Sequence, residues 1–249
     1  MTSTRRLLIT GAASGIGAAV RESALADGLS VAALDRVTPG ATERPTHDAH
    51  SVAVTADVLD PAAVGAAFNL AEQRLDGPLT ELVHCAGVYE PGTATAALPL
   101  ETWTRTLAVN ATGTFVVVQE FARRLIEAGL GGSAVLLSSM ASQRGNQAAP
   151  GNDYGASKGA VEALARGLAQ EWGPSGIRVN VVRPGVIDTP MLRMTDDPEQ
   201  AARYLEQSVP LRRFGRASEV ADACLYLVSN RASYITGAVL DVDGGVLTG

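Results

Sequence analysis

The fold of this chain is decided by one stretch near its start, Arg5-Arg6-Leu7-Leu8-Ile9-Thr10-Gly11-Ala12-Ala13-Ser14-Gly15-Ile16-Gly17. Its first half is a compact apolar run typical of a β-strand, and its glycine-rich second half leads into helical residues 18–26. Glycines allow a positive φ or the close approach of a ligand, and the N–H groups at a helix start attract phosphate oxygens. The stretch therefore predicts a strand, a turn and a helix that bind a pyrophosphate through Gly11, Ser14, Gly15, Ile16 and Gly17.

The glycine turn is not specific by itself. Its spacing is GxxxGxG, whereas the dinucleotide fingerprint is GxGxxG, so a flexible turn of another α/β protein is the alternative. Its place at the head of a β-α-β pattern favours nucleotide binding.

Strand and helix patterns alternate along the rest of the chain. Apolar runs predict strands over residues 5–10, 29–34, 51–56, 79–84, 133–137, 177–182 and 238–242. Helical patterns cover residues 18–26, 61–75, 100–128, 155–172 and 219–229. A chain of 249 residues with 46% hydrophobic content can bury a substantial core, and we expect one α/β domain over residues 1–249.

The second predicted strand ends at Asp35, about twenty residues after the glycine turn, where a carboxylate accepts hydrogen bonds from an adenosine ribose. The same carboxylate would repel the 2′-phosphate of NADP by about 3 kcal/mol per phosphate charge, at about 5 Å and an effective dielectric of about 20. NAD is therefore the favoured cofactor. Arg36 leaves NADP as the less favoured alternative, because its guanidinium could hold the phosphate.

A tyrosine and a lysine one helical turn apart indicate the chemistry. Tyr154 and Lys158 lie at the start of an amphipathic segment, which places the phenol and the ammonium on one face. A free tyrosine has a pKa of about 10, and lowering it to near 7 requires about 4 kcal/mol. An ammonium about 4 Å away supplies a similar free energy. The pair could act as a general acid/base, and an ordinary helix start with a solvated lysine is the alternative.

Small or polar residues follow several predicted strands, on the side where ligands bind in open parallel sheets. They are Asp57-Val58, Ala86-Gly87 and Ser138-Ser139. Asn110 lies in the middle of the predicted helix 100–128, although asparagine is a poor helix former. Such a conflict with local propensity marks a functional candidate, and a surface asparagine is the alternative.

Composition disfavours several classes of function. The formal net charge is -6 and the arginines are scattered, which disfavours nucleic acid and anionic membranes as partners. No run reaches membrane-spanning length and no signal-peptide core precedes the first strand, so we expect a soluble cytoplasmic protein that acts on a small molecule. Cys85 and Cys224 are expected to be buried thiols, His47 and His50 to be solvated, and no metal site is expected.

Together these motifs resemble those of the short-chain dehydrogenases/reductases over nearly the whole chain. The resemblance rests on Thr10-Gly11-Ala12-Ala13-Ser14-Gly15-Ile16-Gly17, Asp57-Val58, Ala86-Gly87, Asn110, Ser138-Ser139, Tyr154 with Lys158, and Arg183-Pro184-Gly185. It implies a Rossmann-like, doubly wound parallel sheet of seven strands with helices on both faces. It also implies a catalytic tetrad of Asn110, Ser139, Tyr154 and Lys158.

The resemblance further implies a role for each of these residues. Tyr154 exchanges the substrate hydroxyl proton while hydride passes to or from nicotinamide, and Ser139 hydrogen-bonds the developing oxyanion. Lys158 lowers the pKa of Tyr154 and holds the nicotinamide ribose, while Asn110 positions a water that relays protons. The implied cofactor contacts also include Asp57 and Val58 at the adenine, and Ile187 and Thr189 at the carboxamide.

The chain departs from the family pattern in two places. It has His84-Cys85 where the family usually has Asn-Asn, and we expect His84 to be packed or on the ribose side, with an extra catalytic base as the alternative. The link from Ser139 to Tyr154 is slightly long and polar. It predicts a polar, oxygenated substrate, unless it is a simple surface loop, and its polar residues are Gln143, Arg144, Asn146, Gln147, Asn152 and Asp153.

The sequence therefore predicts an NAD-dependent oxidoreductase that interconverts a secondary alcohol and a ketone, with a polyol, sugar-like or cyclic hydroxylated substrate. The alternatives are an NADPH-dependent 3-oxoacyl thioester reductase and a non-catalytic NAD(P)-binding sensor. The uneven, arginine-rich residues 188–214 predict a substrate lid. By analogy with the family, we expect a homotetramer that pairs helices 100–128 and 155–172.

Overall fold

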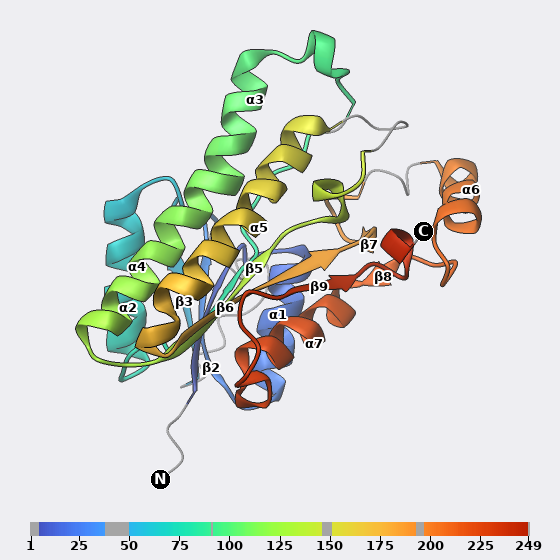
Figure 1. Cartoon of the computed structure of the whole chain (residues 1–249). Coiled ribbons are helices and arrows are strands. Elements are labelled where there is room, and N and C mark those ends of the chain that lie inside the picture. The colour runs from blue at the N-terminus through green and yellow to red at the C-terminus, as the bar shows by residue number, and fades with distance from the viewer. Residues whose placement is uncertain (1–4, 38–49, 91, 146–150, 193–196, 249) are drawn as a thin grey trace.

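Seven parallel strands form one sheet through the centre of the molecule (Figure 1). The structure is a computed structural model that describes residues 5–37, 50–90, 92–145, 151–192 and 197–248. The polar stretch 37–50, which the sequence predicts to be a surface loop, lies outside the described residues at 38–49, including His47, as do Asn146 and Gln147. The expected doubly wound α/β fold is confirmed.

The strand order is β3-β2-β1-β4-β5-β6-β9, so the chain winds outward to one edge and then returns beside β1. Ligands in such sheets bind at the carboxyl ends of the strands where the winding reverses, which here is between β1 and β4. The strands are β1 (Arg6–Thr10), β2 (Ser30–Asp35), β3 (Ser51–Thr55), β4 (Glu81–His84), β5 (Gly132–Leu137), β6 (Ile177–Pro184) and β9 (Val239–Val242).

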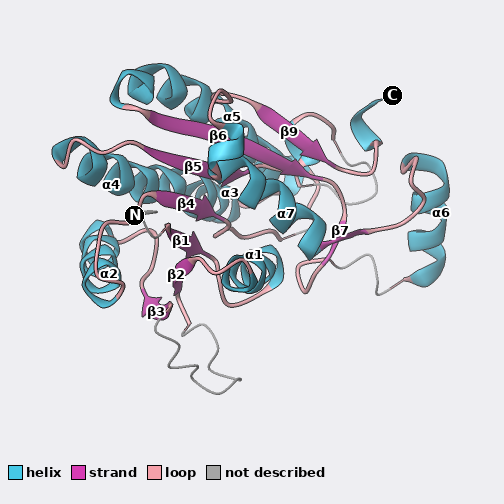
Figure 2. Cartoon of the chain, turned by 90° about the horizontal axis from the view of Figure 1, so that it is seen from below, coloured by secondary structure: helices cyan, strands magenta, loops and turns pink. Residues whose placement is uncertain are grey.

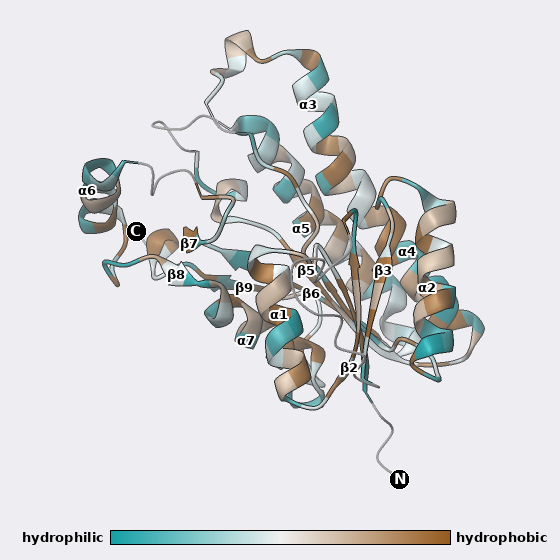
Figure 3. Ribbon diagram, turned by 180° about the vertical axis from the view of Figure 1, so that it is seen from behind, coloured by the Kyte–Doolittle hydropathy of each residue, from teal (hydrophilic) through white to brown (hydrophobic). Residues whose placement is uncertain are grey.

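Helices cover both faces of the sheet (Figure 2). One face packs against α1 (Gly15–Ala26) and α7 (Ala217–Val228), and the other against α2 (Pro61–Arg74), α4 (Gly113–Glu127) and α5 (Asn152–Trp172). The inner strands β1, β2, β4, β5 and β6 are buried on both sides, which explains why they are largely apolar (Figure 3), whereas the edge strands β3 and β9 are partly exposed.

Two apolar cores result from this layering. Successive strand residues point to opposite faces, so Leu7 and Ile9 contribute to one core and Leu8 to the other. Phe68 of α2 and Phe121 of α4 fill the second core and are almost fully buried. The two cores hold the strand ends, and hence the residues at those ends, in fixed positions.

The predicted helix 100–128 is divided in the structure. It consists of α3 (Leu100–Leu107), a π-helical turn (Ala108–Thr112) and α4, and Asn110 lies in the turn. The conflict between asparagine and helix propensity therefore marks a real irregularity of the backbone.

Three short elements lie beyond the strand ends. The strands β7 (Ile187–Asp188) and β8 (Gly215–Arg216) pair in parallel, and α6 (Pro198–Ser208) stands apart from the layers (Figure 2). Asp197 caps α6 by accepting hydrogen bonds from the N–H groups of Glu199 and Gln200. All three fall within or beside the predicted lid.

Candidate active site

A cleft of about 1090 Å³ runs along the carboxyl ends of the strands. This volume is slightly above the usual range of ligand pockets, which is about 300–1,000 Å³. All the predicted site residues except Asn110 line it: Gly11, Ser14, Gly15, Ile16, Gly17, Asp35, Asp57, Val58, Ala86, Gly87, Ser139, Tyr154, Lys158, Ile187 and Thr189. The fold thus brings together motifs that are far apart in the sequence.

The three glycines of the turn are required for different physical reasons. Gly11 and Gly15 have φ of 67° and 54°, in the left-handed region that favours glycine. Gly17 has no such φ, but a Cβ atom there would lie 2.1 Å from the Gly11 carbonyl oxygen. Gly17 therefore allows helix α1 to pack closely on the end of β1.

The start of α1 is open to an anion. The Ser14 side chain makes no capping hydrogen bond, and the first turn of the helix holds no acidic residue. Its first backbone N–H groups have no partner within the helix, and the helix dipole favours negative charge there. A phosphate of a dinucleotide fits this position.

The carboxylate of Asp35 is held firmly at the end of β2. Its Oδ2 accepts a hydrogen bond of 3.0 Å from the N–H of Ala13, and its Oδ1 accepts one of 2.7 Å from the N–H of Arg36. The carboxylate and the Arg36 side chain both line the cleft. The negative Asp35 and the positive Arg36, which have opposite effects on the binding of a 2′-phosphate, therefore both lie at the cleft.

Lys158 is buried on α5, one helical turn after Tyr154. Its side chain is tied to β5, because Nζ donates a 2.8 Å hydrogen bond to the Leu137 carbonyl oxygen. Nζ lies 5.7 Å from the centre of the Tyr154 ring. Burial lowers the pKa of Lys158 to about 8, and the Cys85 thiol acts in the opposite direction.

Tyr154 does not show the lowered pKa that the sequence predicts. Burial raises the pKa of Tyr154 to about 12, the hydroxyl of Ser139 lowers it, and the neighbouring Tyr89 raises it. In the protein alone, the loss of water around the phenol outweighs the hydrogen bond with Ser139. A lowered pKa would need a further positive charge in the cleft.

Asn110 lies beside the cleft and is fully buried. Its Oδ1 accepts a hydrogen bond of 2.8 Å from the N–H of Val88, and its Nδ2 donates to the Val88 carbonyl and to Ser157 Oγ at 2.9 and 3.0 Å. The side chain thus joins the π-helical turn to the loop after β4 and to α5. The water relay implied by the family resemblance stays a prediction.

His84 is the last residue of β4 and packs against the end of β1. Its Nδ1 lies 2.8 Å from Thr10 Oγ1, which also accepts a hydrogen bond from the N–H of Ala86. Burial, and secondarily the charge of Lys158, lower the pKa of His84 to about 3. The imidazole does not line the cleft and is neutral at physiological pH, which favours a structural position over an extra catalytic base.

The Tyr154 end of the cleft is also lined by residues that no motif of the sequence marks. Tyr89 packs on Tyr154 with 4.9 Å between the ring centres, and Tyr204 and Gln200 reach the cleft from α6. The position of Tyr89 just after Ala86-Gly87 was the only available signal. Asp153, expected to border the substrate, is instead buried and accepts a hydrogen bond from Thr106 on α3.

The two cysteines are free in the structure. Burial raises the pKa of Cys85 to about 12 and that of Cys224 well above its usual value, so both are uncharged thiols at neutral pH. Within the described residues there is no group of three or more His, Cys, Asp or Glu side chains suited to a metal ion. Nor does any helix in the described part of the chain have the length and apolar character to cross a membrane.

The chain is similar to known oxidoreductases over most of its length. A family model described as "Enoyl-(Acyl carrier protein) reductase" matches residues 11–247. Galactitol 2-dehydrogenase (L-tagatose-forming) of Cereibacter sphaeroides is 38% identical, over 95% of this chain and 92% of that protein. Human (3R)-3-hydroxyacyl-CoA dehydrogenase is 34% identical, over 96% of this chain and 94% of that protein.

Two solved structures are similar over almost the whole chain. A gluconate 5-dehydrogenase from Burkholderia cenocepacia J2315, in complex with NADP and tartrate, has a TM-score of 0.90 and 30% identity over 98% of this chain and 96% of its own. A 4-hydroxyisoleucine dehydrogenase complexed with NADH has a TM-score of 0.89 and 26% identity over 98% of this chain and 99% of its own.

The fold and these matches define an oxidoreductase that acts on hydroxyl groups with a nicotinamide cofactor. The chain belongs to the short-chain dehydrogenase/reductase family.

Proposed function

We propose that the protein is an NAD-dependent dehydrogenase that interconverts a secondary alcohol and a ketone on a polar, hydroxylated small molecule. The observation that carries this proposal is the single cleft that holds Tyr154, Lys158 and Ser139 at one end and the glycine turn with Asp35 at the other. A sensor needs only the residues that bind the dinucleotide and gains nothing from acid/base residues. The presence of Tyr154, Lys158 and Ser139 in the same cleft therefore favours an enzyme.

The residues of the cleft fit a dinucleotide. The glycine turn and the open start of α1 would hold the pyrophosphate, Asp35 the adenosine ribose, and Asp57 with Val58 the adenine. Ile187 and Thr189 would hold the carboxamide, and Lys158 the nicotinamide ribose. When bound, NAD supplies a ring that exchanges a hydride and that carries a positive charge when oxidised.

NAD is preferred over NADP because of the Asp35 carboxylate. Its hydrogen bonds to two backbone N–H groups fix a negative charge at the cleft wall, where a 2′-phosphate would meet it. Near Asp35, Arg36 is the only described residue of the cleft that favours NADP, because its side chain is cationic. Similar structures contain NADP in one case and NADH in another, so the choice rests on Asp35.

Proton transfer is assigned to Tyr154. In alcohol oxidation the phenolate would accept the hydroxyl proton, and in ketone reduction the phenol would donate it. A positive charge near the phenol lowers its pKa, and Lys158 supplies one such charge below pH 8. Ser139 would donate a hydrogen bond to the substrate oxygen as negative charge develops on it.

A polyol or sugar derivative is the preferred substrate class. The Tyr154 end of the cleft presents polar residues from two loops, from the start of α5 and from α6, namely Tyr89, Arg144, Asn152, Gln200, Tyr204 and Gln207. Such groups suit a substrate with several hydroxyl groups. Two similar proteins are named for substrates of this kind, galactitol and gluconate. The hydroxyacyl-CoA relative keeps a 3-oxoacyl thioester reductase as the second candidate.

The finer features of the molecule are proposed on the same basis. Residues 188–214 would form a lid, since α6 contributes side chains to the cleft from outside the helical layers. By family analogy we expect a cytoplasmic homotetramer that pairs the helices of residues 100–128 and 155–172, and sedimentation velocity of the purified protein would measure its mass. A monomer would contradict that expectation.

A substrate panel tests the proposed function. Purified protein would be mixed with NAD or NADP and with galactitol, gluconate or a 3-hydroxyacyl-CoA, and formation of reduced cofactor would be followed by absorbance. We expect turnover with NAD and a polyol or sugar acid. Turnover with only NADP and the thioester would favour the second candidate, and NADH binding without any turnover would favour the sensor.

A further inference from the structure

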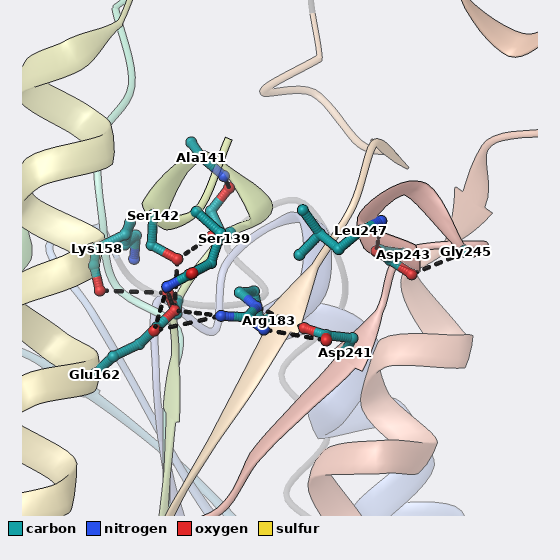
Figure 4. A network of polar contacts seen from close by, with 12 residues as sticks. Ser139, Ala141, Ser142, Lys158, Glu162, Arg183, Asp241, Asp243, Gly245 and Leu247 are labelled. Carbon is teal, nitrogen blue, oxygen red and sulfur yellow. Dashed lines mark hydrogen bonds and ion pairs between the residues drawn. The ribbon is translucent and has the colours of Figure 1, made fainter. Parts of the chain in front are cut away.

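The carboxylate of Glu162 lies at the centre of a polar network next to Ser139 (Figure 4). Glu162 is one helical turn after Lys158 on α5 and only 2% exposed. Its Oε1 accepts hydrogen bonds of 2.7 Å from Ser138 Oγ and 2.5 Å from Ser142 Oγ. Its Oε2 accepts one of 3.3 Å from Gln143 Nε2.

These donors lie on both sides of Ser139 in the sequence. Ser139 is in an extended conformation and begins the 3-10 turn Met140–Ser142, with its Oγ accepting a hydrogen bond from the N–H of Ala141. Ser142 Oγ also contacts the Ser139 carbonyl oxygen at 2.8 Å. Glu162 thus fixes the residue before Ser139 and the turn after it through one carboxylate.

The charge of Glu162 is balanced inside the protein. Nη1 of Arg183 lies 3.4 Å from both carboxylate oxygens, and Nη2 of Arg183 donates a 3.0 Å hydrogen bond to Asp241 on β9. A buried carboxylate is tolerated only when it is paired and hydrogen-bonded. Arg183 therefore pairs with Glu162 and holds its carboxylate in place between α5, β6 and β9.

The same helix carries the proposed acid/base pair. Ser138 Oγ also contacts the Lys158 carbonyl oxygen at 3.3 Å, and Lys158 Nζ holds the Leu137 carbonyl. Several hydrogen bonds consequently tie residues 137–143 to the helix of Tyr154 and Lys158, and Glu162 accepts the two shortest of them.

We propose that Glu162 is a positioning residue that sets the place of Ser139 Oγ relative to Tyr154. This inference rests on the proposed function of Ser139 as the donor to the substrate oxygen. Glu162 itself does not line the cleft, so it would act only through the serine turn. A merely structural Glu162 would affect stability and cofactor binding, whereas a positioning residue affects turnover through Ser139.

Two substitutions at position 162 separate these roles. Glu162→Leu removes both acceptors, and we expect kcat to fall by about 10- to 100-fold because small displacements of catalytic groups have effects of this size. NADH affinity, measured by fluorescence titration, should stay within about twofold, because the glycine turn and Asp35 are unchanged. Glu162→Gln keeps one acceptor oxygen for the two serines but turns an N–H group toward Arg183 and Gln143, and it should recover part of the lost kcat.

Glu81→Leu is the matched control. Glu81 is another buried carboxylate, 7% exposed and paired with Arg5 through hydrogen bonds of 2.6 and 3.0 Å, but it lies at the amino end of β4, away from the cleft. It should lower stability and leave kcat unchanged. A fall of kcat in Glu81→Leu equal to that in Glu162→Leu would assign the effect to general destabilisation and overturn the proposal.

A Ser139→Ala background gives the decisive comparison, measured in single turnovers with enzyme in excess. If Glu162 acts through Ser139, Glu162→Leu should lower the remaining rate by less than about threefold in this background. An undiminished effect there, an unchanged kcat in Glu162→Leu alone, or no recovery in Glu162→Gln would overturn the inference. A wild type that turns over no alcohol would instead overturn the proposed function and, with it, this inference.

Discussion

Burial decides the charge of the titratable side chains around the cleft. Burial is the largest cause of the pKa shifts of Tyr154, Lys158 and His84, and in all three residues the shift favours the uncharged form. The sequence predicts which residues meet and on which helix face, because spacing alone sets that. It cannot predict their pKa values, because those depend on the surrounding side chains, such as Tyr89, that exclude water from the phenol.

The lowered pKa of Lys158 predicts a pH dependence of stability. In the unfolded chain Lys158 keeps its proton until about pH 10.4, whereas in the folded protein it loses the proton near pH 8. Above pH 8 the unfolded state therefore binds more protons, and the contribution of Lys158 to the free energy of unfolding rises with pH, by up to about 1.4 kcal/mol per pH unit. Below pH 8 this contribution is lost.

Urea unfolding of the cofactor-free protein at pH 8 and 9 would measure this contribution, as the difference between wild type and Lys158→Met. From about pH 8 upward the raised pKa values of Cys85 and Cys224 act in the opposite direction, but they do so in both proteins, so the difference isolates Lys158. A difference that stays constant or falls between pH 8 and 9 would contradict a desolvated lysine.

Asp35 predicts the choice of cofactor. Asp35→Asn removes the negative charge and keeps an oxygen that can accept a backbone hydrogen bond. Because the carboxylate is expected to cost a 2′-phosphate about 3 kcal/mol, the ratio of kcat/KM for NAD to that for NADP should fall on the order of 100-fold. Steady-state kinetics with both cofactors would measure it, and a wild type that prefers NADP would contradict the assignment.

At the scale of elements, the strand-turn-helix unit at the start of the chain fixes the cofactor end of the cleft. The sequence predicts this unit, the other six strands and the main helices within a few residues, because apolar periodicity and glycine are strong local signals. It does not predict β7 and β8, which are two residues each and pair only because the fold brings them together. Likewise, the sequence marks Asn110 as unusual but cannot specify a π-helical turn.

Gly17 provides a direct test of this unit. Gly17→Ala would place a Cβ atom 2.1 Å from the Gly11 carbonyl oxygen, so α1 must move away from β1. We expect a loss of stability of about 1–3 kcal/mol, as for other overpacked sites, together with NADH binding weakened by about tenfold or more. Thermal unfolding and NADH titration would measure the two effects.

Gly65→Ala is the control for that change. Gly65 lies inside α2, and a Cβ atom there would meet only Glu120 Oε1, at an ordinary distance of 3.7 Å. Alanine should raise stability by about 0.5–1 kcal/mol and leave NADH binding unchanged. If Gly17→Ala behaved like this control, the proposed role of the turn would be wrong.

At the scale of the whole molecule, the reversal of winding between β1 and β4 creates the cleft. Motifs from residues 11–17, 35, 57–58, 86–87, 139, 154–158 and 187–189 meet there because parallel strands place their carboxyl ends at one edge. This convergence follows from the fold class and could be predicted. The buried Glu162 network could not, because an acidic residue one turn after Lys158 resembles an exposed helix position until β6 and β9 are seen to cover it.

The central claim is that the Tyr154 phenol transfers the proton of the reaction, and Tyr154→Phe tests it most directly. The oxidation rate with NAD and the best alcohol of the panel should fall by at least about 10²- to 10⁴-fold, which is the usual contribution of a general acid/base, while NADH affinity stays within about twofold. A variant that binds NADH and retains near-wild-type turnover would contradict the account.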